Sequence, residues 1–269
     1  MSSFSGKTAI VTGSTQGLGE TTARLLVERG LSKIVITGRD EARGTTVADE
    51  LKQAGCEAHF IAADLQEVDA CRRIVTEART RFDQVDILVN AAGLTSRGTI
   101  FDTSVELWDQ LMAVNLRAPF LLTQDCVNWM RETQTKGSVV NVISTSAYGG
   151  HPFLTPYSTS KGGLATLTKN VAYAVVRNQI QVNGLMLGWM DKPGEDVIQR
   201  TNHTDGQDWF EEADRPFGRL IKADEAAKAI AWLASEESGL KTGALIDFDQ
   251  SIIGGGDAPI PAVGEYGID

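Results

Sequence analysis

The sequence predicts an α/β fold in which about seven parallel strands form a doubly wound sheet between two layers of helices. Short apolar runs alternate with segments of helical periodicity along the chain. Each run is continuously apolar, as is typical of parallel strands that are buried on both faces. The chain has 269 residues, of which 42% are hydrophobic and 22% charged. We therefore expect one domain over residues 1–269.

The expected elements alternate in order along the chain. The first four strands are residues 7–13, 33–38, 57–64 and 85–93, and the helices between them are residues 20–30, 47–55 and 71–82. Helices at about residues 116–130, 156–177 and 223–235 and strands at 137–144, 180–186 and 243–249 complete the pattern. Two polar, irregular segments remain, a lid at about residues 187–220 and a C-terminal tail at about residues 251–269.

A glycine-rich loop, TGSTQGLGE, follows the first strand and leads into the first helix. Its glycines have the spacing TGxxxGxG, which differs from the general GxGxxG dinucleotide fingerprint. Glycines let the backbone approach a pyrophosphate, and the free amides of the next helix point at the phosphates. The alternative is a merely structural turn. The residues expected to contact a cofactor here are Gly13, Thr15, Gln16, Gly17, Leu18 and Gly19.

The end of the second strand favours NADP(H) over NAD(H). Folds that select NAD place an acidic residue here to bond the ribose 2′-hydroxyl. This chain has Thr37 and Gly38, followed by Arg39, whose guanidinium can hold a 2′-phosphate with two hydrogen bonds. The adjoining Asp40 and the uncharged Gln16 in the glycine loop argue against this preference.

Asp64, at the end of the third strand, has two compatible interpretations. It is placed to accept a hydrogen bond from an adenine amino group, and it is also placed to cap the helix that follows.

Tyr157 and Lys161 are four residues apart in the stretch PYSTSKGG. Residues at this spacing share one face of a helix. A cation close to a phenol favours the phenolate and lowers the pKa of the phenol, which makes the tyrosine a usable acid and base. Such a pair on a solvated helix is usually inert, so the rest of the chain decides its meaning.

Four segments taken together resemble the short-chain dehydrogenase/reductase family, namely TGSTQGLG, NAAG at residues 90–93, VN at residues 114–115 and YSTSK at residues 157–161. The resemblance extends from about residue 7 to residue 249. It implies a three-layer Rossmann-type fold, a nicotinamide cofactor, and hydride transfer between an alcohol and a carbonyl. It also implies self-association, as a homotetramer or a dimer.

The resemblance assigns a role to each of four catalytic positions. Tyr157 is the expected proton donor and acceptor, and Lys161 assists it and bonds the nicotinamide ribose. Ser144, thirteen residues before Tyr157, is expected to orient the substrate oxygen, although two other hydroxyl residues follow it directly. Asn115 is expected to hold a water in a proton relay to Lys161. The further expected cofactor contacts are Asp64, Leu65, Asn90, Ala91, Gly93, Gly188 and Met190.

The segment LGWMDKPGE departs from the family pattern of Pro-Gly followed by a threonine. Leu187 replaces the proline, Gly188 is retained, and Lys192 stands where the threonine is expected. The backbone near Met190 is still placed to bind the nicotinamide carboxamide. Lys192 is either a ligand for a phosphate or an anionic substrate, or a solvated loop residue.

The lid is rich in Asp, Glu, Gln, Asn and Thr, which predicts a small polar substrate such as a sugar, a polyol or a hydroxy acid. Aromatic residues of the lid either stack on a sugar ring or anchor the lid, and they are Trp189, Trp209 and Phe210. The candidate substrate contacts are Ser146, His151, Phe153 and Trp189, with Thr95, Ser96 and Leu154 as weaker ones.

The net charge of −10 and the absence of a Lys/Arg-rich run argue against nucleic acid and against an anionic membrane surface as partners. No run of 18 apolar residues and no signal-peptide core is present, which predicts a cytoplasmic protein. Cys56, Cys71 and Cys126 have no metal-ligand spacing, so we expect packed, reduced thiols and no metal.

The sequence therefore predicts an NAD(P)-dependent oxidoreductase that interconverts a secondary alcohol and a ketone on a small polar substrate. The nearest enzymatic alternative is a reductase of 3-oxoacyl groups or of other apolar ketones. The alternative of another class is a catalytically silent NAD(P)-binding sensor.

Overall fold

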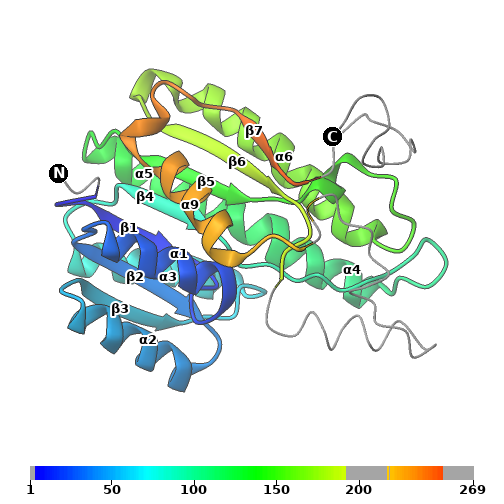
Figure 1. Cartoon of the computed structure of the whole chain (residues 1–269), viewed down its shortest axis with the longest axis horizontal. Helices are drawn as coiled ribbons and strands as arrows, with labels where there is room; N and C mark the ends of the chain where they lie inside the picture. Colours follow the sequence, from blue (N-terminus) through cyan, green and yellow to red (C-terminus); the bar gives the residue numbers. More distant parts are fainter. Residues whose placement is uncertain (1–3, 192–216, 218, 251–269) are drawn as a thin grey trace.

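The computed structural model describes residues 4–191, 217 and 219–250, and these contain a seven-stranded parallel sheet of order β3-β2-β1-β4-β5-β6-β7 (Figure 1). The predicted fold class is confirmed. The strands are β1 Thr8–Val11, β2 Lys33–Gly38, β3 Glu57–Ala62, β4 Ile87–Asn90, β5 Ser138–Val142, β6 Gln181–Leu187 and β7 Leu245–Phe248. Lys192, Trp209, Phe210 and most of the expected lid and tail lie outside the described residues.

Helices cover both faces of the sheet. They are α1 Gly17–Glu28, α2 Glu41–Gln53, α3 Val68–Arg81, α4 Val105–Met112, α5 Ala118–Glu132, α6 Thr155–Val175 and α9 Ala223–Ala234. The apolar faces of α1, α2 and α9 form one core against the sheet, and those of α3, α5 and α6 form a second core on the opposite face. Strands β1, β4 and β5 are buried at every position, which explains why their sequences are mostly apolar.

The strand order reverses between β1 and β4, so a crevice opens at the carboxyl ends of these strands. The register keeps these ends level, because Val11 pairs with Val89 and Asn90 pairs with Asn141. The segments that leave β1, β2, β4, β5 and β6 therefore start from one edge of the sheet. The expected cofactor and catalytic residues lie on these segments or on the helices that follow them, apart from Asp64 and Leu65, which lie just after β3.

The helix expected at residues 116–130 is part of a longer helical stretch. It starts with α4, passes through one π-helical turn, η1 Ala113–Arg117, and continues as α5. The sequence interpretation missed α4, in which Leu111 is the one buried residue, while Val105 and Trp108 are exposed. Helix α4 has only eight residues, which is shorter than the stretch over which helical periodicity is read from a sequence. Its start was visible in Ser104, whose hydroxyl accepts a hydrogen bond from the Leu107 amide.

All three cysteines are free and buried, as expected. Burial raises the pKa of the Cys71 thiol to about 11 and that of Cys56 to about 12. Thiols in this state carry little thiolate and have low reactivity at neutral pH. None of the helices that the structure describes is long and apolar enough to cross a membrane.

Candidate active site

The glycine loop between β1 and α1 is held tightly against the ends of β2 and β4. The Thr12 hydroxyl accepts hydrogen bonds from the amides of Ala91 and Ala92, both at 3.1 Å. The Ser14 hydroxyl donates to the carbonyl of Val11 at 2.6 Å and accepts from the amide of Thr37 at 3.0 Å. These buried bonds fix the loop where the crevice opens.

Each glycine of the loop meets a different steric requirement. Gly13 has φ +64°, and a Cβ on it would lie 2.8 Å from the Cα of Ala92. A Cβ on Gly19 would clash with the carbonyl of Gly13. Gly17 has φ +57° and no atom within 4 Å of its Cβ position, so the backbone at this point faces open space. An open, tightly turned backbone at the start of α1 fits a dinucleotide pyrophosphate.

Two arginines surround the end of β2, and sequence reasoning identified only one of them. Arg39 is exposed directly after the strand. The guanidinium of Arg43, one turn into α2, donates a hydrogen bond to the side chain of Gln16 in the glycine loop. Asp40 is the N-cap of α2, because its carboxylate accepts from the Arg43 amide at 2.9 Å, and it lies 3.6 Å from the Arg43 guanidinium. A second cation therefore lies at the glycine loop.

Asp64 does not cap the helix that follows it, contrary to one of its two expected roles. Its carboxylate accepts a hydrogen bond from the Gln66 amide at 3.0 Å, which is a local turn. Helix α3 begins three residues later than a capping Asp64 requires, with Glu67 at its N-cap. The adjacent Leu65 is buried in the core on the α3 side of the sheet.

The side chain of Asn90 is buried and bonds other buried polar residues. Its side-chain amide donates to the Asn141 side chain at 2.8 Å and to the Thr123 hydroxyl at 3.3 Å. The Asn141 amide in turn donates to Thr168 on α6 at 2.9 Å. This buried chain joins β4 and β5 to α5 and α6, so the Asn90 side chain holds these elements together.

Lys161 lies inside the fold, 4% exposed, on the face of α6 that carries Tyr157. Its ammonium donates a hydrogen bond to the Val142 carbonyl at the end of β5, at 2.8 Å, and lies 5.9 Å from the centroid of the Tyr157 ring. A Cβ on Gly93 would lie 3.5 Å from the same ammonium, so the segment after β4 passes close to Lys161. The phenol and the cation are therefore neighbours, as their spacing predicts.

Ser144 and Ser146 lie side by side after β5, with 2.6 Å between their hydroxyl oxygens. Ser144 also caps the short 3₁₀ helix η2 Thr145–Tyr148 by accepting from the Ser146 amide at 3.2 Å. Ser146 is 5% exposed, whereas Ser144 is more accessible. The more accessible hydroxyl is therefore that of Ser144, the residue that its spacing from Tyr157 predicts. The buried Ser146 hydroxyl is its hydrogen-bond partner.

Asn115 lies in the π-helical turn and is completely buried. Its side chain accepts from the Leu94 amide at 2.8 Å and donates to the Leu94 carbonyl at 2.9 Å. It also donates to the Ser160 hydroxyl at 3.1 Å, and Ser160 donates to the Tyr157 carbonyl at 2.7 Å. Asn115 is thus connected to the helix that carries the tyrosine through Ser160, a residue that sequence reasoning did not identify.

The segment after β6 forms the opposite wall of the crevice. A Cβ on Gly188 would clash with the Asp249 carboxylate, which accounts for the glycine at this position. Met190 pairs with Ile221 in a parallel bridge, and the Trp189 carbonyl accepts from the Ile221 amide at 3.1 Å. This wall is therefore joined to the residues that precede α9.

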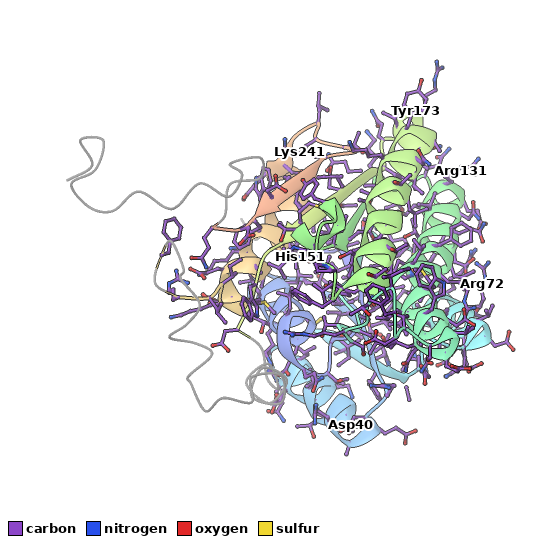
Figure 2. The ribbon with its side chains drawn as sticks, turned by 90° about the vertical axis from the view of Figure 1, so that its right-hand side faces the viewer. Asp40, Arg72, Arg131, His151, Tyr173 and Lys241 are labelled. Carbon is purple, nitrogen blue, oxygen red and sulfur yellow. The ribbon has the colours of Figure 1, made fainter. Side chains whose placement is uncertain are left out.

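His151 and Phe153 are exposed residues on the segment between η2 and α6. In Figure 2, His151 lies near the centre of the view, whereas Asp40 and Arg131 lie at its edges. The Phe153 ring packs against His151 and against the guanidinium of Arg97, which is on the segment after β4. Arg97 escaped sequence reasoning because its neighbours are more than fifty residues away in the chain.

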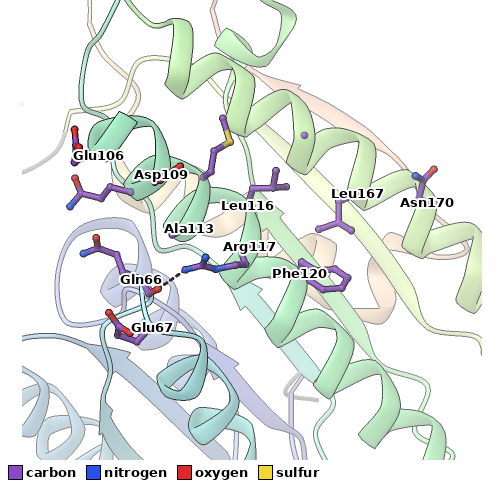
Figure 3. Close-up of a pocket in the computed structure, with 13 residues that line it drawn as sticks. Gln66, Glu67, Glu106, Asp109, Ala113, Leu116, Arg117, Phe120, Leu167 and Asn170 are labelled. Carbon is purple, nitrogen blue, oxygen red and sulfur yellow. Dashed lines mark hydrogen bonds between the residues drawn. The ribbon is translucent and has the colours of Figure 1, made fainter. Parts of the chain in front are cut away.

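A separate groove of about 1060 Å³ lies on the outer face of α4, η1, α5 and α6 (Figure 3). Leu116, Phe120 and Leu167 form its apolar floor, and Arg117 donates a hydrogen bond to the Gln66 carbonyl at its edge. None of the four expected catalytic residues lines this groove. Among the residues that the structure describes, no group of three or more His, Cys, Asp or Glu is placed to hold a metal ion.

The model of the short chain dehydrogenase family matches residues 7–202 of this chain. The chain belongs to the short-chain dehydrogenase/reductase family. An uncharacterized oxidoreductase of Thermotoga maritima is 36% identical over 247 residues, which are 91% of this chain and 97% of that protein. A 3-oxoacyl-acyl-carrier-protein reductase of Aquifex aeolicus is 31% identical over 242 residues, 90% of this chain and 95% of the relative.

A solved structure extends the similarity to the whole fold. The L-sorbose reductase of Gluconobacter frateurii, solved with NADPH and L-sorbose, superimposes with a TM-score of 0.88 at 25% identity, covering 94% of this chain and 99% of the reductase. This short-chain dehydrogenase/reductase is therefore an NAD(P)-binding oxidoreductase that acts on CH–OH and C=O groups.

Proposed function

We propose that this short-chain dehydrogenase/reductase is an NADP(H)-dependent reductase of a ketone group on a small polar substrate. The observation that carries the proposal is the convergence of four side chains at the carboxyl edge of the sheet, beside an open glycine loop. Tyr157 and Lys161 lie on one face of α6, Ser144 follows β5, and Asn115 is bonded through Ser160 to the tyrosine's helix. A cofactor-binding sensor does not need this set.

The reaction needs a hydride on carbon and a proton on oxygen. The glycine loop would hold NADPH, which when bound would supply the hydride for the carbonyl carbon. The Tyr157 hydroxyl donates its proton to the carbonyl oxygen, so that the ketone becomes an alcohol, and it takes the proton back in the reverse reaction. The Lys161 ammonium stabilises the phenolate that remains, and Ser144 donates a hydrogen bond to the substrate oxygen. Asn115 holds the water that returns a proton towards Lys161.

The preference for NADP(H) rests on Arg39 and Arg43. Arg43, which bonds Gln16 of the glycine loop, and Arg39, directly after β2, favour a 2′-phosphate over a free hydroxyl. Asp40, the acidic residue nearest to the end of β2, is engaged by the α2 N-terminus, which removes the main argument for NAD(H). The structurally similar L-sorbose reductase was solved with NADPH.

Thermal unfolding with NADP⁺ and with NAD⁺ tests this preference. We expect a larger stabilisation by NADP⁺, of about 2.7 kcal/mol at 100 times the dissociation constant. Arg39→Gln and Arg43→Gln should each weaken NADP⁺ about tenfold and leave NAD⁺ unchanged, because they remove phosphate contacts worth about 1.4 kcal/mol. Lys52→Gln, at the other end of α2, is the matched control and should change neither. A larger shift with NAD⁺ would reverse the assignment.

The substrate class has one competing interpretation. A polar substrate follows from the polar composition of residues 191–219 and agrees with the sorbose reductase. A 3-oxoacyl substrate is the second candidate, because the Aquifex aeolicus relative carries that name. An acyl carrier protein is acidic and docks on basic surfaces, whereas this chain has a net charge of −10. Turnover of small ketoses against 3-oxoacyl thioesters separates the two, and cofactor binding with no turnover of any ketone would favour the sensor.

We further propose that the chain forms a homotetramer. The groove over α5 and α6 supports this, because it presents an apolar floor to solvent. Phe120 is 41% exposed there, and Tyr173 and Val176 are 85% and 46% exposed at the far end of the same helix layer. Exposed apolar side chains on one helix layer are typical of an interface between subunits.

A further inference from the structure

The segment after β4 and the segment before α6 are fixed side by side next to the catalytic tyrosine. Gly98 and Leu154 form a parallel bridge. The Gly98 amide donates to the Phe153 carbonyl at 3.0 Å, and the Thr155 amide donates to the Gly98 carbonyl at 3.0 Å. Tyr157 follows only two residues after Thr155. Side chains next to this bridge therefore have fixed positions relative to the phenol that handles the substrate oxygen.

Arg97 is held beside this bridge by an aromatic stack. Its guanidinium carbon lies 5.1 Å from the centroid of the Phe153 ring. The ring of His151 supports Phe153 from another side, with 6.0 Å between the two ring centroids and an interplanar angle of 56°. A guanidinium that stacks on an aromatic face keeps its N–H groups directed outward in its own plane. These donors match the two oxygens of a carboxylate.

Formal charge is distributed unevenly around the catalytic residues. Residues 93–98 and 149–155 contain Arg97 and no aspartate or glutamate, although the chain has an excess of ten negative charges. The carboxylates of Asp191 and Asp249 come after β6 and β7 instead. Because β5 lies between β4 and β6, these carboxylates are on the other side of the site from Arg97. The next acid on the β4 side, Asp102, accepts hydrogen bonds from the amide and the hydroxyl of Thr99. A substrate anion near Tyr157 therefore meets the positive charge of Arg97 on the two bridged segments and negative charge after β6 and β7.

We propose that Arg97 binds a carboxylate of the substrate, so that the physiological substrate is a hydroxy acid or the corresponding oxo acid. The carboxylate lies against the Arg97 guanidinium, and the carbonyl to be reduced points at Tyr157. His151 and Phe153 act as positioning residues for the guanidinium. This inference rests on the proposed function, because it assigns a substrate class to the same site.

Ligand binding without turnover gives the first test. The protein saturated with NADP⁺ is melted with butanoate and, separately, with the uncharged butanamide. At ten times its dissociation constant, butanoate should raise Tm by about 3 °C, and butanamide should raise it less than 1 °C at the same concentration. An equal effect of acid and amide on the wild-type protein would overturn the proposal, and this comparison needs no variant.

Variants then assign the effect to Arg97. Arg97→Gln should abolish the butanoate shift, and Arg97→Lys should keep part of it, because lysine retains the charge without the planar fork. Arg131→Gln, an exposed residue of α5, removes one charge at a remote position and should change nothing. A butanoate shift that persists in Arg97→Gln would show that another group binds the acid.

Kinetics separate this inference from the proposed function. Reduction of acetoacetate is compared with reduction of its methyl ester, which has the same ketone and no charge. Arg97→Gln should raise KM for acetoacetate about 10- to 100-fold and leave kcat and the ester kinetics unchanged. Ester reduction that equals or exceeds acetoacetate reduction in the wild-type protein overturns the role of Arg97 and leaves the reductase intact. Failure of the proposed function would have a different result, because neither NADP⁺ nor NAD⁺ would then raise Tm in thermal unfolding.

Discussion

The environment of Lys161 determines what the tyrosine can do at the scale of single residues. The lysine is 4% exposed, and its ammonium donates a hydrogen bond to the Val142 carbonyl at 2.8 Å. A cation with so little water around it interacts more strongly with nearby charge than a solvated one. It therefore favours the phenolate of Tyr157, whose ring centroid lies 5.9 Å away.

Lys161→Met tests this electrostatic role, because methionine has a similar volume and no charge. We expect kcat at pH 7 to fall by about 100-fold or more, since proton transfer by Tyr157 loses its supporting charge. In the oxidative direction, the rate should return partly as the pH rises towards the ordinary pKa of tyrosine, about 10. A pH–rate profile, with circular dichroism to verify the fold, measures this. Near wild-type rates at pH 7 would refute the electrostatic argument.

Sequence reasoning found the residues whose identity depends on short spacing. Tyr157 and Lys161 share one helical turn, and the glycine loop lies within nine residues, so local geometry defines both. Arg43 and Arg97 were missed because each acts through contacts with a distant segment, at Gln16 and at Phe153. Only the folded sheet brings these partners together, and a single sequence contains no signal for such pairs.

At the scale of elements, the π-helical turn η1 joins α4 to α5 and contacts α6 at the site. It places Asn115 inward, where the asparagine joins the Leu94 backbone to Ser160 on α6. A π-helical turn inside a longer helix often marks a functional position, since it costs regular hydrogen bonds. The sequence reveals the strands and the long amphipathic helices. It does not reveal this turn, because no residue type is specific for a π-helical hydrogen bond.

Ser160→Ala should loosen the contact between η1 and α6. It removes the acceptor for Asn115 and the donor to the Tyr157 carbonyl, so the free energy of unfolding should fall by about 1–2 kcal/mol. We expect kcat to fall about tenfold, with KM for NADPH unchanged, because Asn115 and Tyr157 lose a shared support.

Ser158→Ala is the matched control on the same helix. The Ser158 hydroxyl is buried and has no hydrogen-bond partner among the residues that the structure describes, so its removal should leave stability unchanged or raise it. Equal kinetic effects of the two substitutions would show that any small change near Tyr157 disturbs the site. In that case Ser160 would have no specific positioning role.

At the scale of the whole molecule, the catalytic crevice and the groove of Figure 3 lie on opposite sides of one helical stretch. Asn115 points inward from η1, while Leu116 of the same turn lines the groove together with Phe120 of α5. A Cβ on Gly163 of α6 would lie 2.8 Å from the Leu116 side chain, so the two helices approach closely here. A subunit seated in the groove would therefore press directly on the element that positions Asn115.

Phe120→Glu tests assembly and this coupling together. A carboxylate in the apolar floor should dissociate the homotetramer into smaller species, because burying an unpaired charge costs several kcal/mol. Light scattering after size-exclusion chromatography measures the mass, and kcat should fall in parallel because η1 loses its support. Phe101→Glu, at a 95% exposed residue outside the groove, is the control and should keep the wild-type mass. A tetramer that survives Phe120→Glu would locate the subunit interface elsewhere, and a monomeric wild-type protein would refute the homotetramer itself.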